Sequence, residues 1–142
     1  MTELSLLRRG SSLADPAEQL RVLSGTGPEF DRVLRDHGLP ILTARQVEVL
    51  QVNVGKLCNQ TCRHCHVDAG PDRKEAMSPQ VAAACLEVLE RRDIATLDIT
   101  GGAPEMAPVF RQLVDAARSL DRRIIDRCNL TILTAPGYED LA

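Results

Sequence analysis

The chain is poor in aromatic residues and has no excess of positive charge, and each absence argues for or against a kind of protein. Its 142 residues contain no tryptophan, one tyrosine and two phenylalanines, so a core must be built from Leu, Val, Ile and Ala. The net charge of −3 argues against nucleic acid or an anionic membrane as a partner. No apolar run is long enough for a transmembrane helix. With 44% hydrophobic residues, the chain is expected to form one modest folded domain.

The chain also lacks a recognisable export signal. Arg8 and Arg9 stand near the N-terminus, but polar residues follow them instead of an apolar stretch. We therefore expect a cytoplasmic protein with reduced thiols. The five cysteines agree with this, because an odd number with three crowded into eight positions does not suit a disulfide framework.

The segment CNQTCRHC places Cys58, Cys62 and Cys65 at C-x3-C-x2-C spacing, directly after a strand-like run. Three thiolates on one short loop are able to bind three irons of a [4Fe–4S] cluster and leave the fourth iron open to a small molecule. Zinc is an alternative, because His64 and His66 lie in the same loop. Structural zinc usually takes ligands from two separated pairs, however, and the chain has no second cysteine pair. An incidental group of cysteines is the remaining alternative.

From residue 47 onward the sequence alternates between strand-like and helix-like segments. Strands are expected over Val47–Val54, Ala95–Thr100 and Ile124–Leu133, and helices over residues 79–92 and 107–120, with a further helix starting at Tyr138. This alternation predicts an α/β fold with parallel strands and right-handed crossovers. Residues 1–46 are expected to form an N-terminal packing arm with two short helices, over Pro16–Leu23 and Phe30–Asp36, and residues 47–142 to form the core.

Polar and apolar residues alternate along the expected strands. Gln51 and Asp98 alternate with apolar residues along their strands, so they lie on the opposite face from those residues. In the third strand, Arg127 and Asn129 are expected on the polar face. This pattern predicts that one face of the sheet lines a polar cavity near the strand ends, with Arg127 and Asn129 as cofactor or substrate contacts. Polar groups satisfied locally at strand ends are the alternative. Cys128 has the apolar parity, which favours a core position.

A second motif, GGAPE, spans Gly101–Glu105 and directly follows the second expected strand. Two adjacent glycines lack Cβ atoms, so a ligand is able to approach the main chain closely. A tight turn between a strand and a helix is the alternative interpretation, since such turns also favour glycine and proline.

In this order and position, the two motifs resemble those of the radical S-adenosylmethionine (radical SAM) enzymes. The resemblance implies a partial (β/α) barrel of six strands, so we expect this chain, with three βα units, to be an N-terminal portion. It also implies a [4Fe–4S] cluster bound by Cys58, Cys62 and Cys65, and S-adenosylmethionine cleaved by that cluster to methionine and a 5′-deoxyadenosyl radical. No side chain is assigned a catalytic role. The expected cofactor-binding residues include the two polar-face residues and are His64, Gly101, Gly102, Ala103, Pro104, Glu105, Arg127 and Asn129.

Longer stretches around these motifs, CRHCHVDAGP, DITGGAPEM and DRCNLTIL, resemble the arsenosugar-biosynthesis radical SAM enzymes. That resemblance implies a small-molecule substrate, namely a dimethylated arsenical to which the 5′-deoxyadenosyl unit is joined, and an electron donor as partner. Trivalent arsenic binds thiols, so Cys128 is a candidate contact, although its parity favours the core. A radical SAM enzyme with another substrate and a non-catalytic metal-binding fragment are the alternatives.

Overall fold

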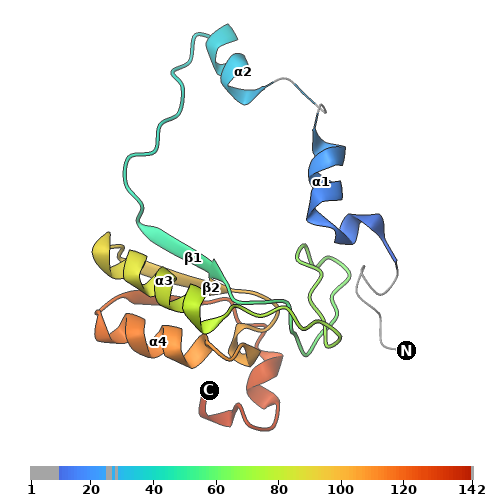
Figure 1. The fold of residues 1–142 in the computed structure, drawn as a ribbon, viewed down its shortest axis with the longest axis vertical. Coiled ribbons are helices and arrows are strands. Elements are labelled where there is room, and N and C mark those ends of the chain that lie inside the picture. Colours follow the sequence, from blue (N-terminus) through green and yellow to red (C-terminus); the bar gives the residue numbers. More distant parts are fainter. Residues whose placement is uncertain (1–9, 25–26, 28, 142) are drawn as a thin grey trace. The chain divides into compact units, whose positions relative to one another are not determined.

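The computed structural model describes residues 10–24, 27 and 29–141. The chain divides into two units, Leu6–Val47 and a second unit that includes Glu48–Ala142, called here the C-terminal unit (Figure 1). Among the described residues, no helix combines the length and the apolar character needed to cross a membrane.

The Leu6–Val47 unit contains a short 3₁₀ helix, η1 (Ser12–Ala14), and two α-helices, α1 (Pro16–Leu23) and α2 (Phe30–Asp36). Both predicted helices are confirmed. Asp15 begins α1, because its carboxylate accepts a hydrogen bond from the Ala17 amide at 2.9 Å and proline occupies the first turn. Of the residues described in α1 and α2, none is buried. The predicted role of residues 1–46 as a packing arm therefore stays a prediction.

The C-terminal unit is built on a parallel sheet of three strands in the order β1 (Val49–Asn53), β2 (Thr96–Thr100) and β3 (Arg123–Asp126). The helices α3 (Pro79–Arg91) and α4 (Phe110–Ser119) form the crossovers (Figure 1). Ser78 starts α3, since its hydroxyl accepts a hydrogen bond from the Val81 amide. The predicted α/β class is confirmed, and the sheet is open rather than closed into a barrel.

Both helices pack on one face of this sheet. The main core joins strand residues such as Leu97 and Ile99 to Leu89 of α3 and Leu113 of α4, all fully buried. Phe110 is the one aromatic residue among the buried residues of this core, as the composition predicts.

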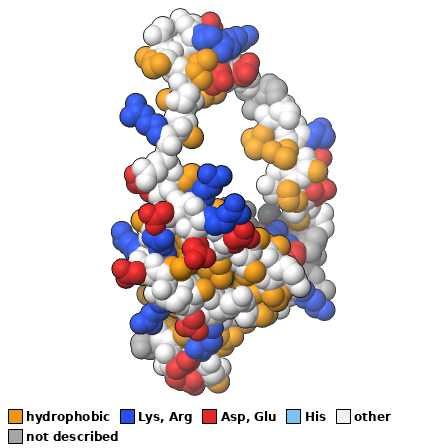
Figure 2. Space-filling model, turned by 60° about the vertical axis from the view of Figure 1, so that its left-hand side comes forward, with side chains coloured by type: hydrophobic (Ala, Val, Ile, Leu, Met, Phe, Trp, Pro, Cys, Tyr) orange, Lys and Arg blue, Asp and Glu red, His pale blue; other side chains and the backbone are white. Residues whose placement is uncertain are grey.

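The inward face of α3 differs from the predicted one. Helical spacing predicts Val81, Cys85, Val88 and Leu89 as its apolar face, but Val81 and Val88 are about half exposed. On the face of the molecule drawn in Figure 2, hydrophobic side chains are exposed among charged ones. The buried stripe instead includes Ala82, which is fully buried. A small side chain lets the helix approach the sheet closely, and hydrophobicity alone does not reveal that.

The opposite face of the sheet carries polar side chains on β1 and β2, as the alternation predicts, although Ile125 of β3 lies in register with Asp98 there. Gln51 of β1 donates from Nε2 to Oδ2 of Asp98 in β2 at 2.9 Å, and Asp98 is only 4% exposed. Leu50, Val52 and Leu97 face the helices instead. The predicted cavity on the polar face stays a prediction.

The third strand is shorter than predicted, and the prediction of a strand over 124–133 is wrong beyond Asp126. Leu130 adopts a positive φ of 62°, which a continuous strand does not allow. The Asn129 side-chain oxygen accepts a hydrogen bond from the Ile132 amide at 3.1 Å and starts the 3₁₀ helix η3 (Thr131–Thr134). Another 3₁₀ helix, η4 (Glu139–Leu141), lies where a longer helix was expected to begin.

Candidate functional site

The cysteine loop leaves the carboxyl end of β1 and is closed by backbone hydrogen bonds. The amide of Cys58 donates to the carbonyl of Gly70 at 3.2 Å, and the amide of Gly70 donates to the carbonyl of Lys56 at 3.0 Å. Cys58 is buried, Cys65 is half-buried and Cys62 is exposed. The three thiols therefore lie on a loop whose base is held in place and whose middle reaches solvent.

Arg73, which was not predicted as a site residue, is buried and stabilises this loop through ion pairs. It is 4% exposed and binds the carboxylate of Asp68 at 2.7 Å and that of Glu75 through Nε and Nη2. The hydrogen bonds from Arg73 lower the pKa of Glu75 to about 2. Asp68 has a positive φ of 53° and so turns the chain where Arg73 holds it. His66, in contrast, is exposed.

Two of the thiols accept hydrogen bonds from amide groups. Cys65 Sγ accepts from the Ala69 amide at 3.2 Å, and Cys58 Sγ accepts from the Gln60 amide at 3.4 Å and from Asn129 Nδ2 at 3.5 Å. N–H donors to sulfur stabilise a thiolate and tune the potential of an iron–sulfur cluster. The loop therefore has the donors that a cluster site uses.

The spacing of the thiols bears on which metal suits them. One tetrahedral zinc ion holds its sulfur ligands within about 4 Å of one another, given Zn–S bonds of about 2.3 Å. Among the described residues, the ligand atoms of Cys58, Cys62 and Cys65 do not form a group within 4.8 Å. Each thiolate of a [4Fe–4S] cluster binds a different iron, so a cluster does not require its thiolates to lie within that distance.

The GGAPE turn packs directly against the base of the cysteine loop. The Gly102 amide donates to the Gly55 carbonyl at 3.0 Å, and the Ala103 amide donates to the Leu57 carbonyl at 2.9 Å. A Cβ atom on Gly102 would lie 2.3 Å from the Leu57 carbonyl oxygen, and one on Gly101 would lie 2.9 Å from that of Gly55. The two glycines are thus needed for two backbone segments to meet.

Arg127 and Asn129 both have partners within the protein. Arg127 binds both carboxylate oxygens of Asp98, at 2.9 and 2.7 Å, and these hydrogen bonds lower the pKa of Asp98. Asn129 donates to Cys58 Sγ and, at 2.8 Å, to Oδ1 of Asn59. Arg127 therefore crosses the polar face of the sheet, whereas Asn129 ties the end of β3 to the cysteine loop.

A second apolar cluster lies beneath the loop and separates its buried thiol from solvent. Its buried members are Cys58, Ala69, Ala103 and Ile132, with Cys65 and Cys128 among the partly buried residues around them. This cluster brings the cysteine loop, the GGAPE turn and η3 together. His64, by comparison, lies exposed on the loop.

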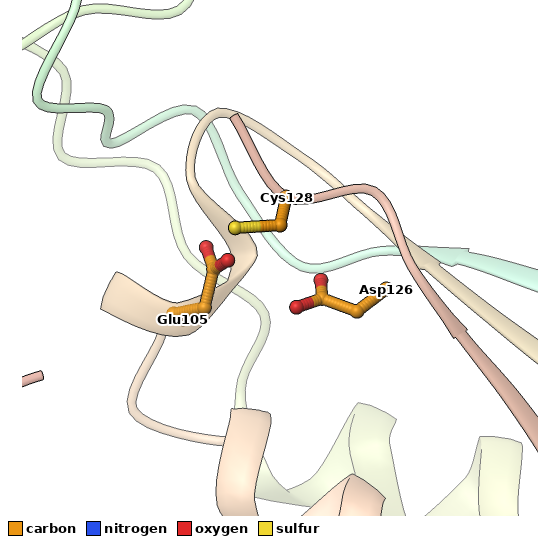
Figure 3. A group of neighbouring side chains, drawn as sticks. All are labelled: Glu105, Asp126 and Cys128. Atoms are coloured by element: carbon orange, nitrogen blue, oxygen red, sulfur yellow. The ribbon is translucent and has the colours of Figure 1, made fainter. Parts of the chain in front are cut away.

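Glu105, the last residue of the GGAPE motif, is buried on the 3₁₀ helix η2 (Pro104–Met106). Its carboxylate faces Asp126 and Cys128, and Figure 3 shows the three side chains pointing toward one another. Desolvation, and next the Glu105 carboxylate, raise the pKa of Asp126 to about 7. Sequence reasoning missed this group, because its three residues come together only in the fold.

Comparisons with known proteins identify the family of this chain. A family model described as the Radical SAM superfamily matches residues 52–142. The chain is also 27% identical, over 82 residues, to a protein of Pyrococcus horikoshii described as a probable GTP 3′,8-cyclase. That similarity covers 58% of this chain and 26% of the relative, so the chain spans about a quarter of the relative's length. No solved structure matches the chain. The motif residues, the parallel sheet and the family match together place this chain in the radical SAM superfamily.

Proposed function

We propose that Cys58, Cys62 and Cys65 bind a [4Fe–4S] cluster that serves the reductive cleavage of S-adenosylmethionine. The observation that carries this proposal is the contact between the cysteine loop and the GGAPE turn at the carboxyl ends of β1 and β2. In this superfamily, the reduced cluster and S-adenosylmethionine together supply a 5′-deoxyadenosyl radical, with the electron coming from an external donor.

The chain's own residues hold and tune the proposed cluster. The amides of Gln60 and Ala69, and Nδ2 of Asn129, point N–H groups at the sulfurs of Cys58 and Cys65. Such donors make the thiolate form more favourable and ease reduction of a bound cluster. The apolar cluster around Cys58 excludes water from the inner side of the loop.

The proposed S-adenosylmethionine site lies on the same edge of the sheet. Its support is the position of Gly101–Glu105 beside the cysteine loop and of His64 on that loop. Arg127 and Asn129 follow β3 at the same edge, so we include them as residues that face or position the cofactor. Their bonds to Asp98 and Cys58 give each a defined orientation.

For the substrate, we propose a dimethylated trivalent arsenical that receives the 5′-deoxyadenosyl unit. The support is the sequence resemblance over Cys62–Pro71 and around the GGAPE turn, described above. The relative from Pyrococcus horikoshii is described as acting on GTP, so GTP is the natural competing substrate to test. An assay with both compounds, read by mass spectrometry for adenosyl–arsenic and for GTP-derived products, distinguishes them.

The cluster itself is tested by electron paramagnetic resonance on anaerobically purified, dithionite-reduced protein, with and without S-adenosylmethionine. We expect a [4Fe–4S]⁺ signal that changes when the cofactor is added, and 5′-deoxyadenosine among the products. Cys62→Ala should lose the signal, whereas Cys85→Ser, a thiol half-buried on α3, should retain it. Protein that carries zinc and no iron would refute the cluster. A signal that ignores the cofactor would refute the S-adenosylmethionine site.

A further inference from the structure

Three potential metal ligands converge outside the cysteine loop. Glu105 comes from η2, Asp126 ends β3, and Cys128 follows two residues later. One carboxylate oxygen from each acid and the Cys128 sulfur all lie within 4.8 Å of one another. Figure 3 shows the three side chains directed at a common point between η2 and the end of β3.

Among the described residues, the Glu105 side chain has no basic partner. Glu105 is only 7% exposed, and among the described residues neither of its carboxylate oxygens has a hydrogen-bond partner. A buried carboxylate without a partner is strongly unfavourable, so native proteins pair it or give it a cation. Arg127, adjacent in sequence to Asp126, is already bound to Asp98. This group is therefore short of positive charge.

A proton or a metal ion would supply that charge. Protonated Asp126 and the Cys128 thiol are each able to donate one hydrogen bond to Glu105, but this still leaves one buried negative charge without a cation. A thiolate with two carboxylates is instead a mixed sulfur–oxygen ligand set, which suits zinc and ions of similar softness. We propose that Glu105, Asp126 and Cys128 bind one divalent ion of the zinc class, with its fourth position open to water or a ligand.

The elements that carry these ligands are held in place before any ion arrives. Cys128 Sγ accepts a hydrogen bond from the Leu130 amide at 3.2 Å, which directs the thiol toward η2. Asp126 is paired in register with Ile99 of β2. Glu105 follows the buried Pro104, whose ring restricts the backbone. Little conformational freedom is thus left to lose on binding.

Binding at this site releases protons. The ion binds Cys128 as a thiolate, so the thiol proton leaves to solvent, together with any proton held between Glu105 and Asp126. No electron is transferred and no other bond is broken. The site does not involve Cys58, Cys62 or Cys65, so it holds or fails independently of the proposed cluster.

Cobalt(II) is the probe of choice, because a cobalt–thiolate bond gives a charge-transfer absorption that zinc lacks. Co²⁺ is titrated anaerobically into the full chain, and into the same chain with Cys58, Cys62 and Cys65 replaced by serine. We expect one Co²⁺ per chain with the thiolate band in the second protein, displaced by Zn²⁺. Cys128→Ser should abolish the band, and Glu105→Gln should weaken binding at least about tenfold. Cys85→Ser, the matched thiol control, should change neither.

Circular dichroism checks that each variant is folded, and Asp126→Asn provides a second ligand variant if Glu105→Gln is not. If the serine-substituted chain does not fold, competition with a chromophoric chelator on cluster-loaded full chain counts the additional ion instead. Failure to bind Co²⁺ would overturn the proposal and leave a proton as the balancing charge. A thiolate band that survives Cys128→Ser would also overturn it, since another thiol would then be the ligand.

Discussion

Replacing Gly102 with alanine tests whether the contact between the GGAPE turn and the cysteine loop organises the site. The new Cβ would lie 2.3 Å from the Leu57 carbonyl oxygen, 2.8 Å from the Leu57 carbonyl carbon and 2.9 Å from the Lys56 carbonyl oxygen. All three atoms are backbone, so a side-chain rotation cannot relieve the clash. The two segments must separate, and the amide hydrogen bonds of Gly102 and Ala103 are then lost.

The expected loss of stability follows from these contacts. Two backbone hydrogen bonds contribute about 1 kcal/mol each, and overpacking costs about 1–3 kcal/mol. Gly102→Ala should therefore lower the free energy of unfolding by about 3–5 kcal/mol, a large part of the stability of a small domain. With a urea m-value of about 1.5 kcal/mol/M, the unfolding midpoint falls by about 2–3 M.

The assay is urea unfolding followed by circular dichroism, since the chain has no tryptophan to report by fluorescence. Iron bound per chain after anaerobic reconstitution is measured in parallel and should fall. Gly27→Ala is the control, because nothing lies within 4 Å of a Cβ built there. An unchanged midpoint together with wild-type iron content in Gly102→Ala would refute the reasoning.

Four further outcomes are expected. Glu75 has a pKa of about 2 in the folded protein against an ordinary 4.5, so the stability that it contributes is present above pH 4.5 and is lost as the pH falls toward 2. Glu75→Gln should therefore make the free energy of unfolding depend less on pH between 4.5 and 2, and an unchanged dependence would contradict the ion pair with Arg73. Arg73→Met should cost about 3 kcal/mol in urea unfolding by leaving two carboxylates unpaired, and a neutral result would contradict its role in the loop. Asn129→Ala removes an N–H donor from Cys58 and should make the cluster potential more negative in a redox titration, whereas an equal potential would exclude that contact. Leu89→Ala should cost about 2–5 kcal/mol while Val88→Ala, at a half-exposed position, costs under about 1 kcal/mol; equal losses would contradict the observed face of α3.

Local patterns predicted the elements well where neighbouring residues decide the structure. Both helices of the Leu6–Val47 unit begin and end as expected, and Ser78 starts α3 as its position before a proline suggests. Predictions that rested on extending a local pattern were less successful. The third strand ends at Asp126, because Leu130 turns the chain and the Asn129 side chain accepts a hydrogen bond from the Ile132 amide in the next 3₁₀ helix.

The same division holds for the candidate site. The spacing of Cys58, Cys62 and Cys65 indicates the chemistry of the site from the sequence, since three thiols within eight positions lie on one loop. The reason for the glycines did not follow from the motif, because the carbonyls that crowd Gly101 and Gly102 belong to a segment about 45 residues away. Sequence alone also gave no signal for Arg73 as the inner support of the loop.

The sequence by itself determined the family, the alternation of strands and helices and the three cysteines of the candidate cluster site, because each depends on residues close together in the chain. Only the tertiary structure decided which polar groups meet. Parallel strands bring their carboxyl ends to one edge, and this places Asn129 against Cys58 and Glu105 against Asp126 and Cys128. Contacts of this kind depend on register, on turns and on burial, and these are properties of the packed chain rather than of any segment.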